Sequence, residues 1–297
     1  ATRAPGTDAL ETSGDGMSQQ AQVMQGKRGL VMGVANDRSI AWGIAKRLHE
    51  QGARLALTYQ GDAMLKRVRP LAQKVDAEIL QPCDVADDES MDAAFEAVRE
   101  QWGSIDFLVH AIAYADRDEL KDEYVHTSRE GFLRSLEISC YSFTAAAQRA
   151  APMMNDGGSL LTLTYYGAER VMPHYNVMGV AKAALESSVR YLAQDLGDRG
   201  IRVNAVSAGP IRTLAASGIG DFRYILKWNE LNSPLRRNVT QDQVGNSAVY
   251  LLSELSSATT GEVHHVDSGY HTVGMMAVDA APQLADLLEN LKSEPNP

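Results

Sequence analysis

The fold class is decided by residues 28–51, which read RGLVMGVANDRSIAWGIAKRLHEQ. The short apolar run at 28–34 is typical of a buried strand, and the helical period that follows predicts a helix from Ser39, a good N-cap residue, to about Gln51. Gly33 permits a tight turn between them, and the helix N-terminus offers N–H groups and a positive dipole to a pyrophosphate. The pattern lacks the middle glycine of GxGxxG, so a turn without a ligand fits the spacing equally well.

Short apolar runs continue to alternate with amphipathic segments along the chain. Strands are expected at residues 53–59, 77–81, 105–110, 159–163, 201–206 and 262–267, and helices from 62, at 89–102, 131–150 and 176–198. This alternation implies right-handed crossovers and a parallel sheet covered on both faces. We predict a single doubly wound, Rossmann-like α/β domain over residues 17–297. Residues 1–16, which precede Met17, are expected to be a disordered leader or a non-native remnant.

The charge balance narrows the function classes. A formal net charge of -10 argues against nucleic-acid binding and against a polybasic membrane-surface role. The chain has no apolar run of the ~18 residues that a membrane span needs. Its two cysteines, Cys83 and Cys140, show no metal-ligand spacing and suit a reducing compartment. We therefore expect a cytoplasmic protein that binds no metal, nucleic acid or membrane.

Candidate cofactor residues follow the first three predicted strands. In doubly wound sheets, ligands bind at the carboxyl ends of the strands near the switch in strand order. Gln60 ends the second strand, where a polar side chain can reach the adenosine ribose. No Arg follows it directly to hold a 2′-phosphate, although Lys66 and Arg67 are near, which favours NADH over NADPH. Asp84 follows the third strand and is either an adenine contact or the N-cap of the next helix.

The most informative segment runs from residue 161 to Lys182. Short-chain dehydrogenases place a Tyr four residues before a helical Lys and a Ser about thirteen residues before that Tyr. Here these two positions hold Met178 and Tyr165, while Tyr175 stands seven residues before Lys182. Seven helical residues span about 10.5 Å along the axis, which separates the phenol from the ammonium and leaves room for a larger electrophile. The spacing fits reduction of a C=C bond conjugated to a carbonyl.

Together these motifs resemble the bacterial enoyl-acyl-carrier-protein reductases, a divergent branch of the short-chain dehydrogenase/reductase family. The resemblance spans residues 26–270. It is carried by Gly33-x5-Ser39-Ile40-Ala41, Tyr59-Gln60, Cys83-Asp84-Val85, Tyr165, Tyr175-Asn-Val-Met-Gly-x-Ala-Lys182 and Ala208-Gly-Pro-Ile-Arg-Thr213-Leu-Ala-Ala-Ser217.

The resemblance implies a reaction and a partner. NADH gives hydride to Cβ of a trans-2-enoyl thioester, in the last step of the type II fatty acid elongation cycle. Tyr175 stabilises the enolate oxygen, Lys182 binds the nicotinamide ribose, and Tyr165 is a second phenol or a gate. Acyl carrier protein delivers the substrate to a homotetramer. This acidic partner requires a basic contact surface on the enzyme. The candidates are Arg223, Lys227, Arg236 and Arg237, and the alternative is that they are ordinary surface charges.

The resemblance also implies the lining of the site. Residues 214–231 resemble a mobile substrate-covering segment, in which Ile219, Phe222 and Ile225 line an acyl tunnel or, equally, form a helical core stripe. The expected cofactor residues are Gly33, Ser39, Ile40, Gln60, Asp84, Val85, Ala111, Lys182, Ile211 and Thr213. The expected substrate residues are Ala113, Tyr114, Ala115, Tyr165, Tyr175, Ala215, Ile219 and Phe222.

One segment departs from the family pattern. Residues 110–115 read HAIAYA, where family members often have Ser at Ala111, Gly at Ala113 and Phe at Tyr114. The methyl group of Ala113 leaves inhibitor fit at this point open. Two other functions also remain open: a 3-ketoacyl or carbonyl reductase on the same fold, and a dinucleotide-binding regulator without turnover.

Overall fold

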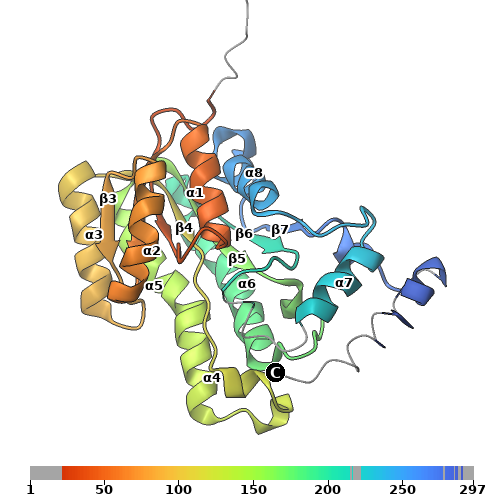
Figure 1. Ribbon diagram of the computed structural model, residues 1–297. Coiled ribbons are helices and arrows are strands. Elements are labelled where there is room, and N and C mark those ends of the chain that lie inside the picture. Colours follow the sequence, from red (N-terminus) through yellow and green to blue (C-terminus); the bar gives the residue numbers. More distant parts are fainter. Residues whose placement is uncertain are drawn as a thin grey trace, which may run out of the picture.

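The computed structural model describes residues 22–214, 216, 222–276, 278–283, 285–286 and 289 of the chain. The leader expected at 1–16 and the expected substrate residues Ala215 and Ile219 lie outside these residues. The described part is built on one seven-stranded parallel sheet in the order β3-β2-β1-β4-β5-β6-β7 (Figure 1). The strands are β1 (Arg28–Met32), β2 (Arg54–Tyr59), β3 (Ile79–Pro82), β4 (Ile105–His110), β5 (Met154–Thr164), β6 (Arg202–Ala208) and β7 (Val263–Val266).

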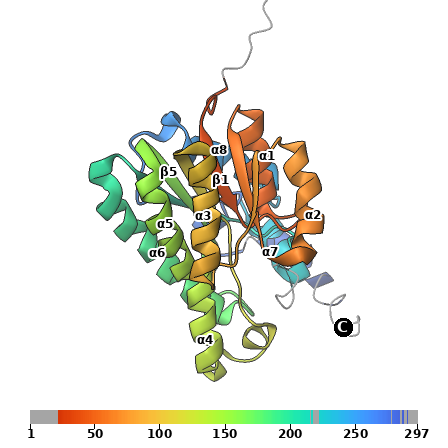
Figure 2. The same cartoon turned by 90° about the vertical axis from the view of Figure 1, so that its left-hand side faces the viewer.

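Helices cover both faces of this sheet, which confirms the predicted fold class (Figure 2). The helices are α1 (Ile40–Glu50), α2 (Gly61–Lys74), α3 (Asp88–Trp102), α4 (Arg129–Leu136), α5 (Ser142–Ala150), α6 (Asn176–Leu196), α7 (Phe222–Asn232) and α8 (Gln241–Leu252). One apolar core lies between the sheet and α3, α5 and α6. A second lies between the opposite face and α1, α2 and α8. The central strands are therefore buried on both faces, which explains their continuous apolar runs in the sequence.

Two features of the helices differ from the sequence-based expectation. The helix expected at 131–150 contains a π-helical turn, Glu137–Tyr141, between α4 and α5. Helix α8 was not expected, although Thr240 and Gln243 form a capping box that marks its start. It packs closely along α1, where a Cβ added to Gly43 would stand 2.6 Å from the Cβ of Gln241. The small residue allows this close helix crossing.

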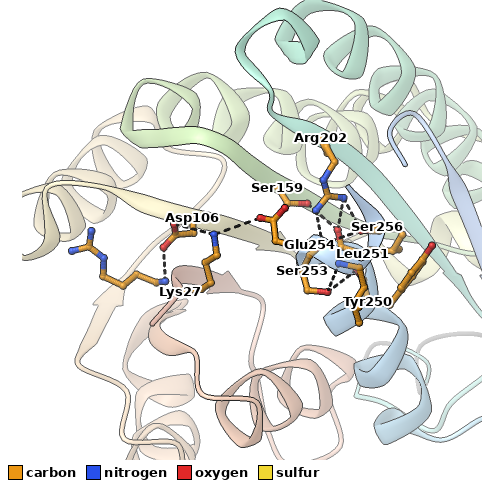
Figure 3. Close-up of polar contacts among 11 residues, drawn as sticks. Lys27, Asp106, Ser159, Arg202, Tyr250, Leu251, Ser253, Glu254 and Ser256 are labelled. Atoms are coloured by element: carbon orange, nitrogen blue, oxygen red, sulfur yellow. Dashed lines mark hydrogen bonds and ion pairs between the residues drawn. The ribbon is translucent and has the colours of Figure 1, made fainter. Parts of the chain in front are cut away.

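At the amino ends of the strands, charged side chains form hydrogen bonds and ion pairs with neighbouring elements (Figure 3). Arg202, at the start of β6, donates hydrogen bonds to the carbonyl oxygens of Leu251 at 2.7 Å and Ser253 at 3.0 Å. These carbonyls belong to the C-terminal end of α8, where backbone acceptors have no partner within the helix. Lys27 lies between Asp106 and Glu254, at 3.8 and 3.6 Å from their carboxylates. This end of the sheet is a structural anchor for α8.

No helix in the described ranges is both long enough and apolar enough to cross a membrane.

Candidate active site

The strand order reverses between β1 and β4, and the turns that follow these two strands lie side by side. The N–H of Ala111 donates to the carbonyl of Met32 at 3.0 Å, so the chain after β4 continues along the end of β1. Gly33 has a φ of 102°, and a Cβ on it would stand 2.1 Å from the carbonyl oxygen of Ala111. Only glycine fits this conformation and this approach. The switch point thus has the open backbone turn that dinucleotide binding requires.

The first turn of α1 presents backbone amides next to Gly33. Ser39 occupies the N-cap position, but its side chain does not cap the helix. Its hydroxyl instead donates to the carbonyl of Asn36 at 2.7 Å and closes the preceding turn. The amides at this N-terminus are left for an anion, as a pyrophosphate site needs. Ile40 is half-buried against the core beside them.

The adenosine side of the expected cofactor site is polar and open. Gln60 is exposed at the N-cap of α2, and its side chain makes no capping hydrogen bond. Asp84 is half-buried, and its carboxylate accepts a hydrogen bond from the N–H of Ala86 at 3.0 Å. The N-cap of α3 is Asp87, so the alternative role considered for Asp84 is wrong. Val85 packs beside it against the core of α3.

Tyr175 is held in place by unusual backbone geometry. It is the N-cap residue of α6, and its neighbours His174 and Asn176 have φ values of 57° and 36°. Two departures into the left-handed region, one on each side of Tyr175, are strained and are maintained only by surrounding contacts. Asn176 supplies such a contact by donating to the carbonyl oxygen of Asp122 at 2.7 Å. Gly167 supplies space, because a Cβ there would lie 2.4 Å from the ring of Tyr175.

The structure brings Tyr165 and Tyr175 together. Their rings meet edge to face with centroids 5.1 Å apart, and Tyr175 is only 8 % exposed. Burial raises the pKa of both phenols well above the usual value, with a smaller contribution to Tyr175 from Tyr165. Both hydroxyls therefore stay protonated at neutral pH and can donate hydrogen bonds. Ala115 and Tyr165 pack against an apolar cluster that includes Tyr175, Met178 and Ala181.

Lys182 is buried on α6, two turns beyond Tyr175. Its ammonium donates a hydrogen bond to the carbonyl of Leu163, near the end of β5, at 2.8 Å. Burial lowers its pKa to about 8, against a smaller raising effect of Cys140 and Glu186. An ammonium has three donors, so two remain for other acceptors. A buried cation with spare donors at the carboxyl end of a strand is suited to binding ribose hydroxyls.

The π-helical turn binds the backbone of the segment that follows β4. The hydroxyl of Ser139 accepts from the N–H of Tyr114 at 2.9 Å and donates to its carbonyl at 3.0 Å. The backbone at the expected substrate residues is thereby fixed. The side chain of Tyr114 turns outward and bonds to Asp116 at 2.6 Å, and Ala113 is exposed. Sequence reasoning missed Ser139, because a π-helical turn has no reliable local signature.

The remaining expected residues lie around β6 and α7. Ile211 is half-buried against the core, and the Thr213 hydroxyl accepts from the N–H of Ala216 at 3.1 Å. Phe222 is half-buried at the start of α7, whereas Ile225 is only 5 % exposed. Burial of Ile225 fits both the acyl-tunnel and the core-stripe alternatives.

Two further buried polar residues were not singled out from the sequence. His110 bonds to Thr162 at 3.1 Å and to Ser142 at 2.8 Å, and burial lowers its pKa to about 3. It is therefore neutral and structural. Glu186 accepts a hydrogen bond from Thr164 at 2.6 Å. Its position four residues after Lys182 was the signal in the sequence that could have identified it.

Among the described residues, no cluster of three or more His, Cys, Asp or Glu side chains could hold a metal ion.

This combination of a doubly wound parallel sheet, a glycine turn at its switch point and a buried Tyr–Lys pair defines a Rossmann-type protein of the short-chain dehydrogenase class. The model of one family, described as enoyl-(acyl carrier protein) reductase, matches residues 33–271. The chain belongs to this family, as the resemblance predicted.

Individual relatives agree. The chain is 70% identical over 264 residues to enoyl-acyl-carrier-protein reductase (NADH) 1 of Rhizobium meliloti (strain 1021), covering 89% of this chain and 97% of that protein. It is similar to the crystal structure of the Anaplasma phagocytophilum reductase in complex with NAD, with a TM-score of 0.83, 59% identity and coverage of 86% and 96% of the two chains. The Bacillus cereus reductase with NADP+ and an indole naphthyridinone has a TM-score of 0.83, 55% identity and coverage of 85% and 99%.

Proposed function

We propose that this protein reduces the trans-2 C=C bond of enoyl thioesters carried by acyl carrier protein, with NADH, in the last step of the fatty acid elongation cycle. The observation that carries the proposal is the buried Tyr175–Lys182 pair with Met178 between them, at the switch-point edge of a sheet. A ketoreductase needs a phenol at the position of Met178. That side chain is apolar and only 6% exposed in the cluster around Tyr175.

The residues present fit a nicotinamide dinucleotide. The Gly33 turn is a cradle that a Cβ would fill, and the α1 N-terminus beside it lacks a side-chain cap. When bound there, NADH supplies the hydride. Lys182 has donors for the ribose hydroxyls, and Ile211 and Thr213 follow β6 at the same edge of the sheet. Gln60 carries no charge to pair with a 2′-phosphate, which supports NADH over NADPH.

Tyr175 is the residue that stabilises the substrate during the reduction. Its phenol stays protonated, so its hydroxyl donates a hydrogen bond to the thioester oxygen, where negative charge develops as Cβ accepts hydride. Because the phenol is held by strained backbone and by packing before substrate arrives, little reorganisation is needed during the reaction. Tyr165 stands against it as a second phenol that closes the pocket.

A substrate comparison tests the reaction type. NADH oxidation is followed by absorbance with crotonyl thioester and, separately, with acetoacetyl thioester, using NADPH as the alternative cofactor in a parallel series. We expect turnover with crotonyl thioester and NADH. Turnover confined to acetoacetyl thioester would identify a ketoreductase. Cofactor binding without any turnover would identify a dinucleotide-binding regulator that has no enzymatic activity.

Acyl carrier protein is the proposed substrate carrier, with a basic surface beside α7 as its contact. Arg223, Arg236 and Arg237 are exposed there, and Lys227 pairs with Glu230 at 3.2 Å. A hollow of about 320 Å³ includes Arg223 and Lys227 in its lining. Reversing charge with Arg237→Glu should raise KM for the carrier-bound substrate several-fold. KM for an uncharged N-acetylcysteamine thioester should not change.

We further propose a homotetramer in the bacterial cytoplasm. Leu133 on α4, Tyr141 on the π-helical turn and Tyr191 on α6 are all more than half exposed. Helices α4 and α6 are neighbours, so these side chains provide apolar surface for a partner subunit. Light scattering should give about four times 32.3 kDa. Both cysteines are free, as a reducing compartment would have them.

A further inference from the structure

A buried carboxylate, that of Glu186, lies one helical turn beyond Lys182 on α6. Glu186 is 7% exposed and lies four residues further along α6. Side chains at this spacing are neighbours on one face of a helix. Burying a carboxylate is costly unless it is paired or hydrogen-bonded, so Glu186 requires an explanation that ordinary surface charge does not give.

The last two residues of β5 hold both of these charged side chains. The carbonyl of Leu163 accepts from the Lys182 ammonium at 2.8 Å, and the hydroxyl of Thr164 donates to Glu186 at 2.6 Å. Thr164 is 4% exposed, so this contact is screened from solvent. The end of one strand therefore binds both the ammonium of Lys182 and the carboxylate of Glu186.

We propose that Glu186 is a positioning residue for the reduction: its carboxylate, anchored on Thr164, keeps the buried Lys182 ammonium charged and directed toward the nicotinamide ribose. The inference rests on the role proposed above for Lys182. Without a nearby anion, a buried lysine loses its proton readily, because burial disfavours the charged form. A neutral amine would be a poorer donor to the ribose and would supply no positive charge to the site.

Other titratable groups face this pair from the surrounding elements. Cys140 of the π-helical turn and neutral His110 at the end of β4 act on Lys182 or respond to its charge. Burial raises the pKa of Glu186, the hydrogen bond from Thr164 opposes this effect, and Glu169, His265 and Arg190 have smaller influences. Glu169 and His265 bond to each other at 2.7 Å. Glu186 also contributes to the raised pKa of Tyr175.

Two substitutions separate charge from hydrogen bonding. Glu186→Gln keeps an acceptor for Thr164 but removes the charge, whereas Thr164→Val removes the hydrogen bond but keeps the charge. The dissociation constant for NADH is measured by fluorescence between about pH 6 and 10, a range that brackets the lysine titration. The alkaline limb, where affinity falls as Lys182 loses its proton, should move down by about one pH unit in Glu186→Gln. It should move little in Thr164→Val, and Glu186→Asp should restore most of the shift.

The double variant assigns the effect to Lys182. In a Lys182→Met background, Glu186→Gln should leave the pH dependence of NADH binding unchanged, because the titrating group is gone. Asp195→Asn, at an exposed position of α6, serves as the matched control. An unchanged alkaline limb in Glu186→Gln, or a shift that persists without Lys182, overturns the inference. If Lys182→Met itself leaves NADH binding and turnover unchanged, the proposed function fails instead.

Discussion

The two edges of the sheet use charged and polar side chains in opposite ways. At the amino edge, Arg202 is satisfied by several acceptors at the end of α8, and Arg28 donates to the Trp102 carbonyl and to Ser104 at 2.8 Å each. At the carboxyl edge, the Lys182 ammonium makes one hydrogen bond to the part of the chain that the structure describes, and burial shifts the pKa of Lys182 down and that of Tyr175 up.

This difference separates stability from chemistry. Saturated hydrogen bonds fix the structure, because every donor already has an acceptor. Donors that remain available in a buried site cost stability but can bind a ligand or a developing charge. The strained residues His174 and Asn176 belong to the same carboxyl edge. Substitutions at the two edges should therefore affect different measurements.

The largest expected effect is on turnover at the carboxyl edge. Tyr175→Phe keeps the ring that packs against Tyr165 and removes only the hydroxyl. We expect kcat to fall roughly 10²–10³-fold, the loss found when a single oxyanion donor is removed. The dissociation constant for NADH should change less than about twofold, since the phenol is assigned to the substrate. Steady-state and binding assays check both values, and a fall in kcat of less than about tenfold would contradict the assignment.

The next effect is on stability at the amino edge. Arg202→Met removes the guanidinium donors from the carbonyls of Leu251 and Ser253, which keep hydrogen bonds from Ser159 and Ser256. The free energy of unfolding should decrease by about 1–3 kcal/mol, because charged hydrogen bonds are lost, while kcat at 25 °C stays the same. Urea denaturation followed by circular dichroism measures the change, with exposed Arg129→Met as the control. A loss of activity in the folded variant would show that the two edges are not independent.

A stabilising substitution is expected at the carboxyl edge. Lys182→Met should raise the free energy of unfolding at pH 7 by about 1–3 kcal/mol, because burial lowers the pKa of this lysine to about 8 from 10.5. Between these values the unfolded chain binds more protons, so stability of the unsubstituted protein rises with pH there. The advantage of the variant should therefore shrink by pH 10. Thermal midpoints at both pH values test this, and a variant less stable at pH 7 refutes it.

The smallest effect concerns acid stability at the amino edge. Glu78 bonds to Arg54 and Trp102, and the hydrogen bond from Arg54 is the main cause that lowers its pKa from 4.5 to about 2. This group stabilises the fold above pH 4.5 and loses its contribution as the pH falls toward 2. Glu78→Gln should cost about 1 kcal/mol at pH 7, because the pair is partly exposed to solvent. The cost should vanish in denaturation curves near pH 2, whereas a pH-independent cost would point to packing.

Much of the fold followed from local pattern. The expected strand at 105–110 matches β4, and the helix expected at 176–198 matches α6 to within two residues. Apolar runs and caps act over a few residues, so the sequence displays them directly. Helix α8 was missed because its apolar residues pack against α1, nearly 200 residues earlier in the chain, and its capping box is a weak local signal.

The sequence by itself determined the fold class, the glycine turn at Gly33 and the seven-residue spacing of Tyr175 and Lys182, because these depend on residues close together in the chain. Tertiary structure alone decided how that pair is tuned. The ring of Tyr165, the strand end that orients Lys182 and Glu186, and the Arg202 anchor at the opposite edge are contacts between separate elements. Burial and hydrogen bonding set the protonation of a side chain, and both arise only when distant segments pack together.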